Sequence, residues 1–218
     1  MRRFFHNELE TMRSHLTLMG EKAIEATRLG FTSLIEKDVA LAEQVIAGDD
    51  AIDDLEIEID QEATRYLTLR APVASDLRLI TVAIKASHDL ERVGDEAHTI
   101  AKRSRKLLVK GCGNYNLGEL PQMADKVVNL FEKALECFIQ EDAERAREVL
   151  AGDQEVDDLN AANIKFFIKQ AKMDPNDINC FVDLIFISKS LERIADHATN
   201  LAEEVIFLTT AQETRHRA

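Results

Sequence analysis

Two acidic sequence patterns each occur twice in this chain, in the same order. The segment AGDDAIDDL at 47–55 returns as AGDQEVDDL at 151–159, an offset of 104 residues. The segment LERVGD at 90–95 returns as LERIAD at 191–196, an offset of 101 residues. Two repeats at nearly the same spacing indicate a duplicated unit of about a hundred residues. The chain is therefore expected to fold as two similar halves, and the repeated carboxylates are the first candidates for a functional site.

Composition and periodicity both predict helices. The 218 residues include only three Pro and eight Gly, and 31% are charged. Apolar residues recur at steps of three and four, which is the helical period. We expect an all-α fold of two tandem three-helix bundles, with residues 1–110 as the first bundle and 111–218 as the second. The expected helices span residues 7–36, 39–69, 73–108, 120–140 and 143–171, with a last helix from Asp174 to residue 208.

The repeated carboxylates are spaced four residues apart, so both members of a pair lie on one helix face. If the second and third helices of each bundle pack antiparallel with these faces together, four carboxylates converge. Unit charges ~4 Å apart repel by about 4 kcal/mol at an effective dielectric near 20, and a bound cation would remove this repulsion. Hard oxygen ligands suit iron, manganese, magnesium, calcium or zinc. The predicted metal ligands are Asp49, Asp53, Glu91 and Asp95 in the first half and Asp153, Asp157, Glu192 and Asp196 in the second.

A structural interpretation of the same residues stays open. Carboxylates four residues apart are common on solvated helix faces, and Arg92 and Arg193 lie next to the glutamates, where they could form ion pairs with neighbouring Asp residues. His88 and His98 are possible nitrogen ligands. Their counterparts in the second half are a lysine and a threonine, so the duplication favours two surface histidines.

The charge, the cysteines and the hydropathy exclude several classes of function. The net charge of −13 opposes nucleic-acid binding, and the one basic cluster, at 102–106, is expected to interact with a helix C-terminus. Cys112, Cys137 and Cys180 show no C-x-x-C spacing, which argues against a disulfide framework and a thiolate zinc site. No run approaches the ~18 apolar residues of a membrane span, so we expect a cytoplasmic protein.

With its four acidic pairs in register, the chain resembles the PhoU family. The segments FHNEL at 5–9 and LMG at 18–20 are also similar to the family's first helix. The resemblance covers essentially the whole chain and implies paired metal-binding motifs, for which we expect iron, with zinc, manganese or magnesium as alternatives. It further implies a cytoplasmic, dimeric, non-enzymatic negative regulator of the phosphate-starvation response. Its implied partners are the ATPase subunit of the phosphate ABC transporter and a sensor histidine kinase.

Two other functions are compatible with the sequence, and it also suggests self-association. A carboxylate-bridged di-metal enzyme would normally supply Glu-x-x-His pairs, and the chain has only Glu213 to His216, near its end. A helical adaptor without metal is the second alternative. Apolar residues on the first helix, among them Phe4, Phe5, Leu16, Met19 and Phe31, suggest a surplus of apolar surface that could form a homodimer interface.

Overall fold

The computed structural model describes residues 2–112 and 116–212, with side chains described from residue 7 onward. Within these ranges every element is helical, which confirms the all-α prediction. The helices are α1 (Arg2–Glu36), α2 (Val39–Gly48), α3 (Asp50–Arg70), α4 (Ala74–Val109), α5 (Leu120–Gln140), α6 (Ala143–Met173), the 3₁₀ turn η1 (Pro175–Asp177) and α7 (Ile178–Thr210).

Local signals that recur in both halves set the helix starts. Asp38 accepts hydrogen bonds from the backbone N–H groups of Ala40 and Leu41 at the start of α2. Asp142, 104 residues later, accepts the equivalent bonds at the start of α6. An aspartate at this position satisfies N–H groups that have no partner inside the helix. The duplication therefore extends to the capping residues, beyond the acidic pairs.

One expected helix is divided. The sequence predicted a single helix over 39–69, but the structure interrupts it at Asp49, where α2 ends and α3 begins. Gly48 has a low helix propensity. At the break, the backbone N–H of Ile52 donates to the Asp49 carbonyl over three residues, the tighter 3₁₀ spacing. The counterpart α6 runs without interruption, so the two halves differ at the start of the first acidic pair.

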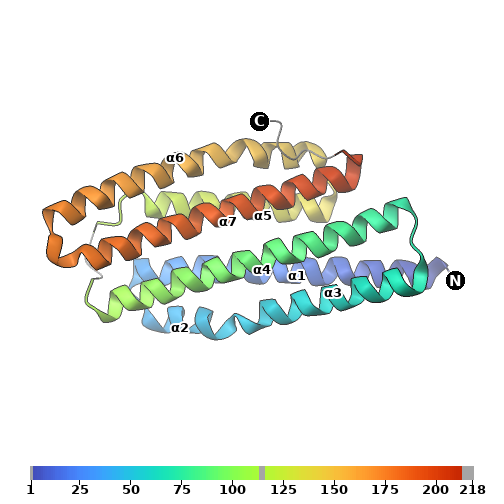
Figure 1. Cartoon of the computed structure of the whole chain (residues 1–218), viewed down its shortest axis with the longest axis horizontal. Coiled ribbons are helices and arrows are strands. Elements are labelled where there is room, and N and C mark those ends of the chain that lie inside the picture. The colour runs from blue at the N-terminus through green and yellow to red at the C-terminus, as the bar shows by residue number, and fades with distance from the viewer. Residues whose placement is uncertain (1, 113–115, 213–218) are drawn as a thin grey trace.

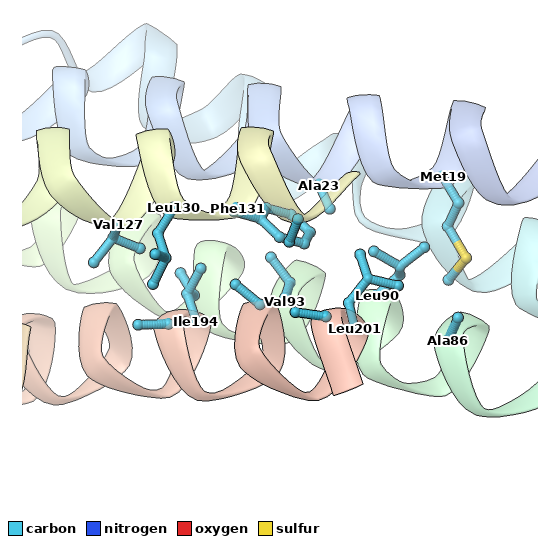
Figure 2. Packing of buried hydrophobic residues seen from close by; sticks show 14 of the residues in the cluster. Met19, Ala23, Ala86, Leu90, Val93, Val127, Leu130, Phe131, Ile194 and Leu201 are labelled. Atoms are coloured by element: carbon cyan, nitrogen blue, oxygen red, sulfur yellow. The ribbon is translucent and has the colours of Figure 1, made fainter. Parts of the chain in front are cut away.

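The two halves lie side by side and share one core. Figure 1 shows α1 to α4 below α5 to α7, with α4 and α7 running next to each other between the halves. Figure 2 shows Val93 of α4 near Phe131 of α5 and Leu201 of α7. All three side chains belong to a single continuous cluster of buried residues that includes both halves. The duplicated unit is therefore visible in the topology, while the hydrophobic core is common to both copies.

Buried ion pairs join the halves along α4 and α7. The carboxylate of Asp183 is only 2% exposed and lies 2.8 Å from Arg103 Nη1 and 2.7 Å from Lys106 Nζ. Glu204, 3% exposed, lies 3.1 Å from Lys85 Nζ. Carboxylates this deeply buried require a counter-charge. Two members of the basic cluster at 102–106 thus neutralise Asp183 across the interface, a role that the sequence did not indicate.

Two expectations from the sequence are wrong. Cys112 and Cys180 form a disulfide, because the end of α4 brings Cys112 to the start of α7 although 68 residues separate the two cysteines. Leu16, Met19 and Phe31 are at most 5% exposed and belong to the core, so they provide no surplus surface for a dimer. The side chains of Phe4 and Phe5 lie outside the described residues. Among the described helices, none is long and apolar enough to cross a membrane.

Candidate metal sites

The first predicted site lies where α3 packs against α4. Asp49 and Asp53 come from the start of α3, and Glu91 and Asp95 from the middle of α4. Gly94 permits the close approach of the two helices, because a Cβ at this position would lie 3.0 Å from Ile52 Cδ1. This contact brings the acidic faces of α3 and α4 near each other.

The carboxylates of this site repel one another. Burial raises the pKa of Asp53, and the neighbouring charges of Asp49 and Asp95 raise it further. Burial also raises the pKa of Glu91, together with the charge of Asp95 and against the lowering effect of Arg92. Both shifts are in the direction produced when carboxylates are desolvated beside like charges. The four residues therefore form one electrostatic cluster.

Neighbouring side chains contact several of these carboxylates. His98 Nδ1 lies against the carboxylate of Asp49, and its other ring nitrogen, Nε2, is buried with no hydrogen-bond partner among the described residues. Arg92 Nη1 lies 3.1 Å from Asp95 Oδ2, and Arg92 Nε lies 3.3 Å from Glu91 Oε2. Arg92 therefore forms the ion pair with a neighbouring Asp that was expected if these carboxylates bind no metal. His98 is not a free surface side chain, because its imidazole is only 18% exposed.

One group of side chains in the first repeat approaches coordination geometry. Ligand atoms of Glu56, His88 and Glu91 all lie within 4.8 Å of one another, and His88 Nδ1 is 3.3 Å from Glu56 Oε1. It is the one such group of three or more among the described residues. Neither predicted quartet is gathered to this distance, and Glu91 is the member of the predicted set that takes part.

Sequence reasoning missed Glu56 because it relied on the duplication. Glu56 follows Asp53 by three residues and so shares its helix face, which was an available signal. Its counterpart in the second repeat is Asn160, so comparison of the two halves gave it no support. The same comparison led to His88 being interpreted as a surface histidine, and its side chain is indeed 60% exposed.

The second predicted site lies between α6 and α7. The pKa of Asp153 is raised to about 6. Burial is the largest cause, and the charges of Asp157, Asp196 and Glu192 also raise it. Burial, Glu192 and Asp157 likewise raise the pKa of Asp196. All four predicted carboxylates of this repeat thus act on one another. Lys189, which replaces His88, forms an ion pair with Glu192, so an ammonium group supplies positive charge here.

Both repeats bury one oxygen of the repeated glutamate. Oε2 of Glu192 is buried and accepts no hydrogen bond from any described residue, whereas Oε2 of Glu91 is buried beside Arg92 Nε, 3.3 Å away. A buried carboxylate oxygen without a donor is costly unless something binds it. A cation would satisfy this oxygen of Glu192, would compete with Arg92 for that of Glu91, and would reduce the repulsion among the neighbouring carboxylates in both repeats, so these residues fit a metal ion. Arg193, which could have neutralised Glu192, instead pairs with Glu96 of the first repeat at 2.9 Å.

Both halves of the chain match one known protein domain. The family model of the PhoU domain matches the chain twice, at residues 16–104 and 120–205. The chain belongs to the PhoU family. These two PhoU repeats coincide with the two copies of the acidic pairs, each match containing one α3/α4 or α6/α7 pair.

Relatives of the chain are named for phosphate transport. The PhoU homolog of the phosphate-specific transport system from Pseudomonas putida is 39% identical over 97% of this chain and 83% of its own length. The homolog from Pseudomonas aeruginosa is 38% identical over 97% of the chain and 88% of its length. Both are named accessory proteins rather than enzymes.

Solved PhoU structures share the whole fold. PhoU from Pseudomonas aeruginosa superposes with a TM-score of 0.92 at 38% identity, over 95% of this chain and all of that one. The phosphate transport system regulatory protein PhoU from Streptococcus pneumoniae gives a TM-score of 0.89 at 27% identity, over 97% of this chain. The arrangement of two tandem PhoU repeats is therefore the family fold. The Glu213 to His216 pair, the enzyme alternative, lies outside the described residues.

Proposed function

We propose that this chain is a cytoplasmic, metal-binding regulator of phosphate uptake that represses the phosphate-starvation response. The observation that carries the proposal is the pair of PhoU repeats, which occupies most of the chain and is shared with relatives named accessory proteins of phosphate-specific transport. The chain would act by docking to the ATPase subunit of the phosphate ABC transporter and to a sensor histidine kinase. This action requires binding surfaces and no catalytic step.

Metal binding is proposed at the acidic clusters of both repeats. In the first repeat Glu91, Glu56 and His88 would supply the ligands, with Asp53 and Asp95 beside them. In the second repeat the ligands would come from the quartet around Asp153 and Glu192. Iron is the first candidate, and zinc, manganese or magnesium are alternatives, because each accepts carboxylate oxygen. A bound cation would tie α3 to α4 and α6 to α7, so metal loss would alter a docking surface.

We also propose that the chain forms a homodimer. The support is the family membership alone. The apolar residues of α1 that first suggested an interface are buried in the core and do not support it. Light scattering at several protein concentrations tests this point, and a particle of about 25 kDa throughout would show a monomer, given the 24.6 kDa chain mass.

Gene deletion tests the regulatory role. Deletion in a host that has the transporter, the kinase and no second copy should turn on phosphate-starvation genes in high phosphate. The intact chain should restore repression, and a variant with Glu91→Ala and Glu192→Ala should bind less metal by elemental analysis. If deletion leaves expression unchanged in that host, the regulatory proposal is wrong. If the double variant keeps its full metal content, the metal assignment is wrong and the regulatory role is still open to its own test.

A further inference from the structure

A groove made of two adjoining hollows follows the seam between α1 and α5, the first helices of the two repeats. Two hollows of about 540 and 460 Å³ lie along it and share Arg28 and Glu132, which form an ion pair of 2.6 Å between them. Near one end, Gly20 lets the helices approach closely, because a Cβ there would lie 2.7 Å from Leu135 Cδ1.

The dimensions of the groove match a short helix. On α1 the lining residues occur at 21, 24, 25, 28, 31, 32 and 35, which is a single helical face. The facing residues of α5 extend from 124 to 139, and residue 21 shares a hollow with 139 while residue 35 shares one with 125. The two walls are therefore antiparallel and about 21 Å long, the length of roughly four helical turns.

The groove carries exposed apolar side chains at both ends. Ile35 is 46% exposed at one end and Ile139 is 52% exposed at the other. Between them apolar and charged side chains alternate along the lining. The apolar lining residues with exposed surface are Ile24, Ile35, Val128 and Ile139, while Phe31 and Leu135 form the floor and are only 5% exposed. Such a surface gains free energy when a partner's apolar side chains displace water from it.

Carboxylates border this apolar lining on both walls. Glu132 is engaged by Arg28, and Glu136 lies 3.5 Å from Arg145. Glu21, Glu25 and Asp125 are exposed, and across the part of the chain that the structure describes no ion pair engages them. Unpaired carboxylates around an apolar groove favour a ligand with cationic flanks.

We propose that the α1/α5 groove binds an amphipathic α-helix of a partner protein, about four turns long, with apolar side chains on one stripe and Lys or Arg on its flanks. The inference deepens the docking role proposed above and rests on it for the existence of a partner. A second copy of this chain fits poorly, because a two-fold contact over the groove would bring two acidic borders, each with Glu21, Glu25 and Asp125, into one interface. An anionic membrane surface would be repelled by the same residues.

The test uses the full chain and a synthetic probe, so that binding is measured without knowledge of the partner. The probe is a helical peptide of about 16 residues with leucines at i, i+3, i+4 and i+7 spacing and lysines on both flanks, and a second peptide carries glutamate in place of lysine. Fluorescence anisotropy gives the dissociation constants. We expect the lysine peptide to bind and the glutamate peptide to bind at least about tenfold more weakly.

Matched variants separate the groove from general attraction to an acidic protein. The groove variant carries Glu21→Lys, Glu25→Lys and Asp125→Lys, and we expect it to weaken binding of the lysine peptide by about tenfold or more. Its control changes three exposed carboxylates on α2, α3 and α6 by the same charge and should weaken binding by less than about threefold. The control substitutions are Glu43→Lys, Asp60→Lys and Glu148→Lys.

A second pair of variants tests the apolar lining without changing charge. Ile35→Ser with Ile139→Ser should weaken binding by about tenfold, because the two side chains lie at the ends of the groove. The control, Ile57→Ser with Ile168→Ser, alters two isoleucines of similar exposure, 53% and 45%, outside it. All four substituted side chains are exposed, and thermal unfolding confirms that each variant is folded.

Three results would overturn the inference. The first is equal weakening by the groove and control variants, which would show non-specific attraction. The second is no weakening by either groove variant. The third is conversion of a dimer to a monomer by the groove variants, which would make a second copy the occupant. If the peptide fails to bind while the intact chain restores repression in the deletion host, the groove inference is wrong and the proposed function stands.

Discussion

His88 Nδ1 lies 3.3 Å from Glu56 Oε1 on the face that α4 turns to α3, while the equivalent positions of the second repeat hold Lys189 and Asn160. The first repeat thus offers imidazole and carboxylate ligands beside Glu91. The second repeat offers an ammonium group beside Glu192. Two repeats with the same paired motifs therefore have different ligand chemistry.

This difference predicts opposite effects of matched substitutions. His88→Ala should weaken metal binding in the first repeat by about tenfold, because one nitrogen ligand is lost. Lys189→Ala should leave binding in the second repeat unchanged or strengthen it, because it removes a cation that competes for Glu192. Calorimetric titration of each variant, with the other repeat disabled, measures both effects. Equal losses of affinity in the two variants would contradict the assignment.

Asp153→Asn should stabilise the metal-free protein. The pKa of Asp153 is raised from 3.8 to about 6 by burial and by three neighbouring carboxylates, so its ionised form destabilises the fold at neutral pH. Removal of this charge should increase the free energy of unfolding by about 1 kcal/mol after solvent screening. Urea denaturation in the presence of a chelator measures the change. The same variant should bind less metal, and a fall in stability without metal would show that Asp153 is a structural residue.

The pH dependence of this effect has a definite sign. The folded pKa of Asp153 lies above its unfolded value, so the folded state binds the proton more tightly and the contribution of Asp153 to stability falls as the pH rises from about 4 to about 6. Above that range the penalty is fully present. The stability difference between Asp153→Asn and the wild type should therefore be small near pH 4 and reach its maximum above about pH 6. Chemical denaturation of both proteins at matched pH values tests this, and a difference that shrinks as the pH rises would contradict it.

Removing the cations of the buried Asp183 ion pair should destabilise the protein more than removing the charge of Asp183. Arg103→Ala with Lys106→Ala leaves Asp183, 2% exposed, without its cations and should cost about 3–5 kcal/mol. Asp183→Asn should cost less, about 1–3 kcal/mol, because both cations are partly exposed and remain hydrated. Thermal or urea unfolding of the two variants gives the comparison. Equal costs would mean that Asp183 is not stabilised by these two partners.

Much of the fold could be predicted because the relevant signals are local. Pro72 and Pro175 mark helix boundaries through their fixed backbone geometry, and the helical period of apolar residues indicates which faces are buried. The duplication then assigns the helices to two equivalent units. The break at Asp49 was not predicted, because the 3₁₀ hydrogen bond to Ile52 depends on packing as well as on the sequence around Gly48.

The parts of the site that escaped prediction depend on contacts between distant segments. The Cys112–Cys180 disulfide and the Asp183 ion pairs arise only when α4 lies against α7, and no spacing pattern encodes that contact. Glu56 was missed for a different reason. Candidate ligands were chosen because they occur in both repeats. A residue that occurs in only one repeat, such as Glu56, is not found in this way.

The two PhoU repeats share one core, so they pack against each other as two subunits of a dimer would, but within a single chain. A single ancestral repeat would have had to cover the same apolar faces with another copy of itself, and fusion fixes that pairing in a one-to-one ratio. Fusion also frees each copy to change alone, as Asn160 and Lys189 illustrate. The common core also couples the stability of the two copies. A destabilising substitution in either copy unfolds the common core and removes both acidic clusters together.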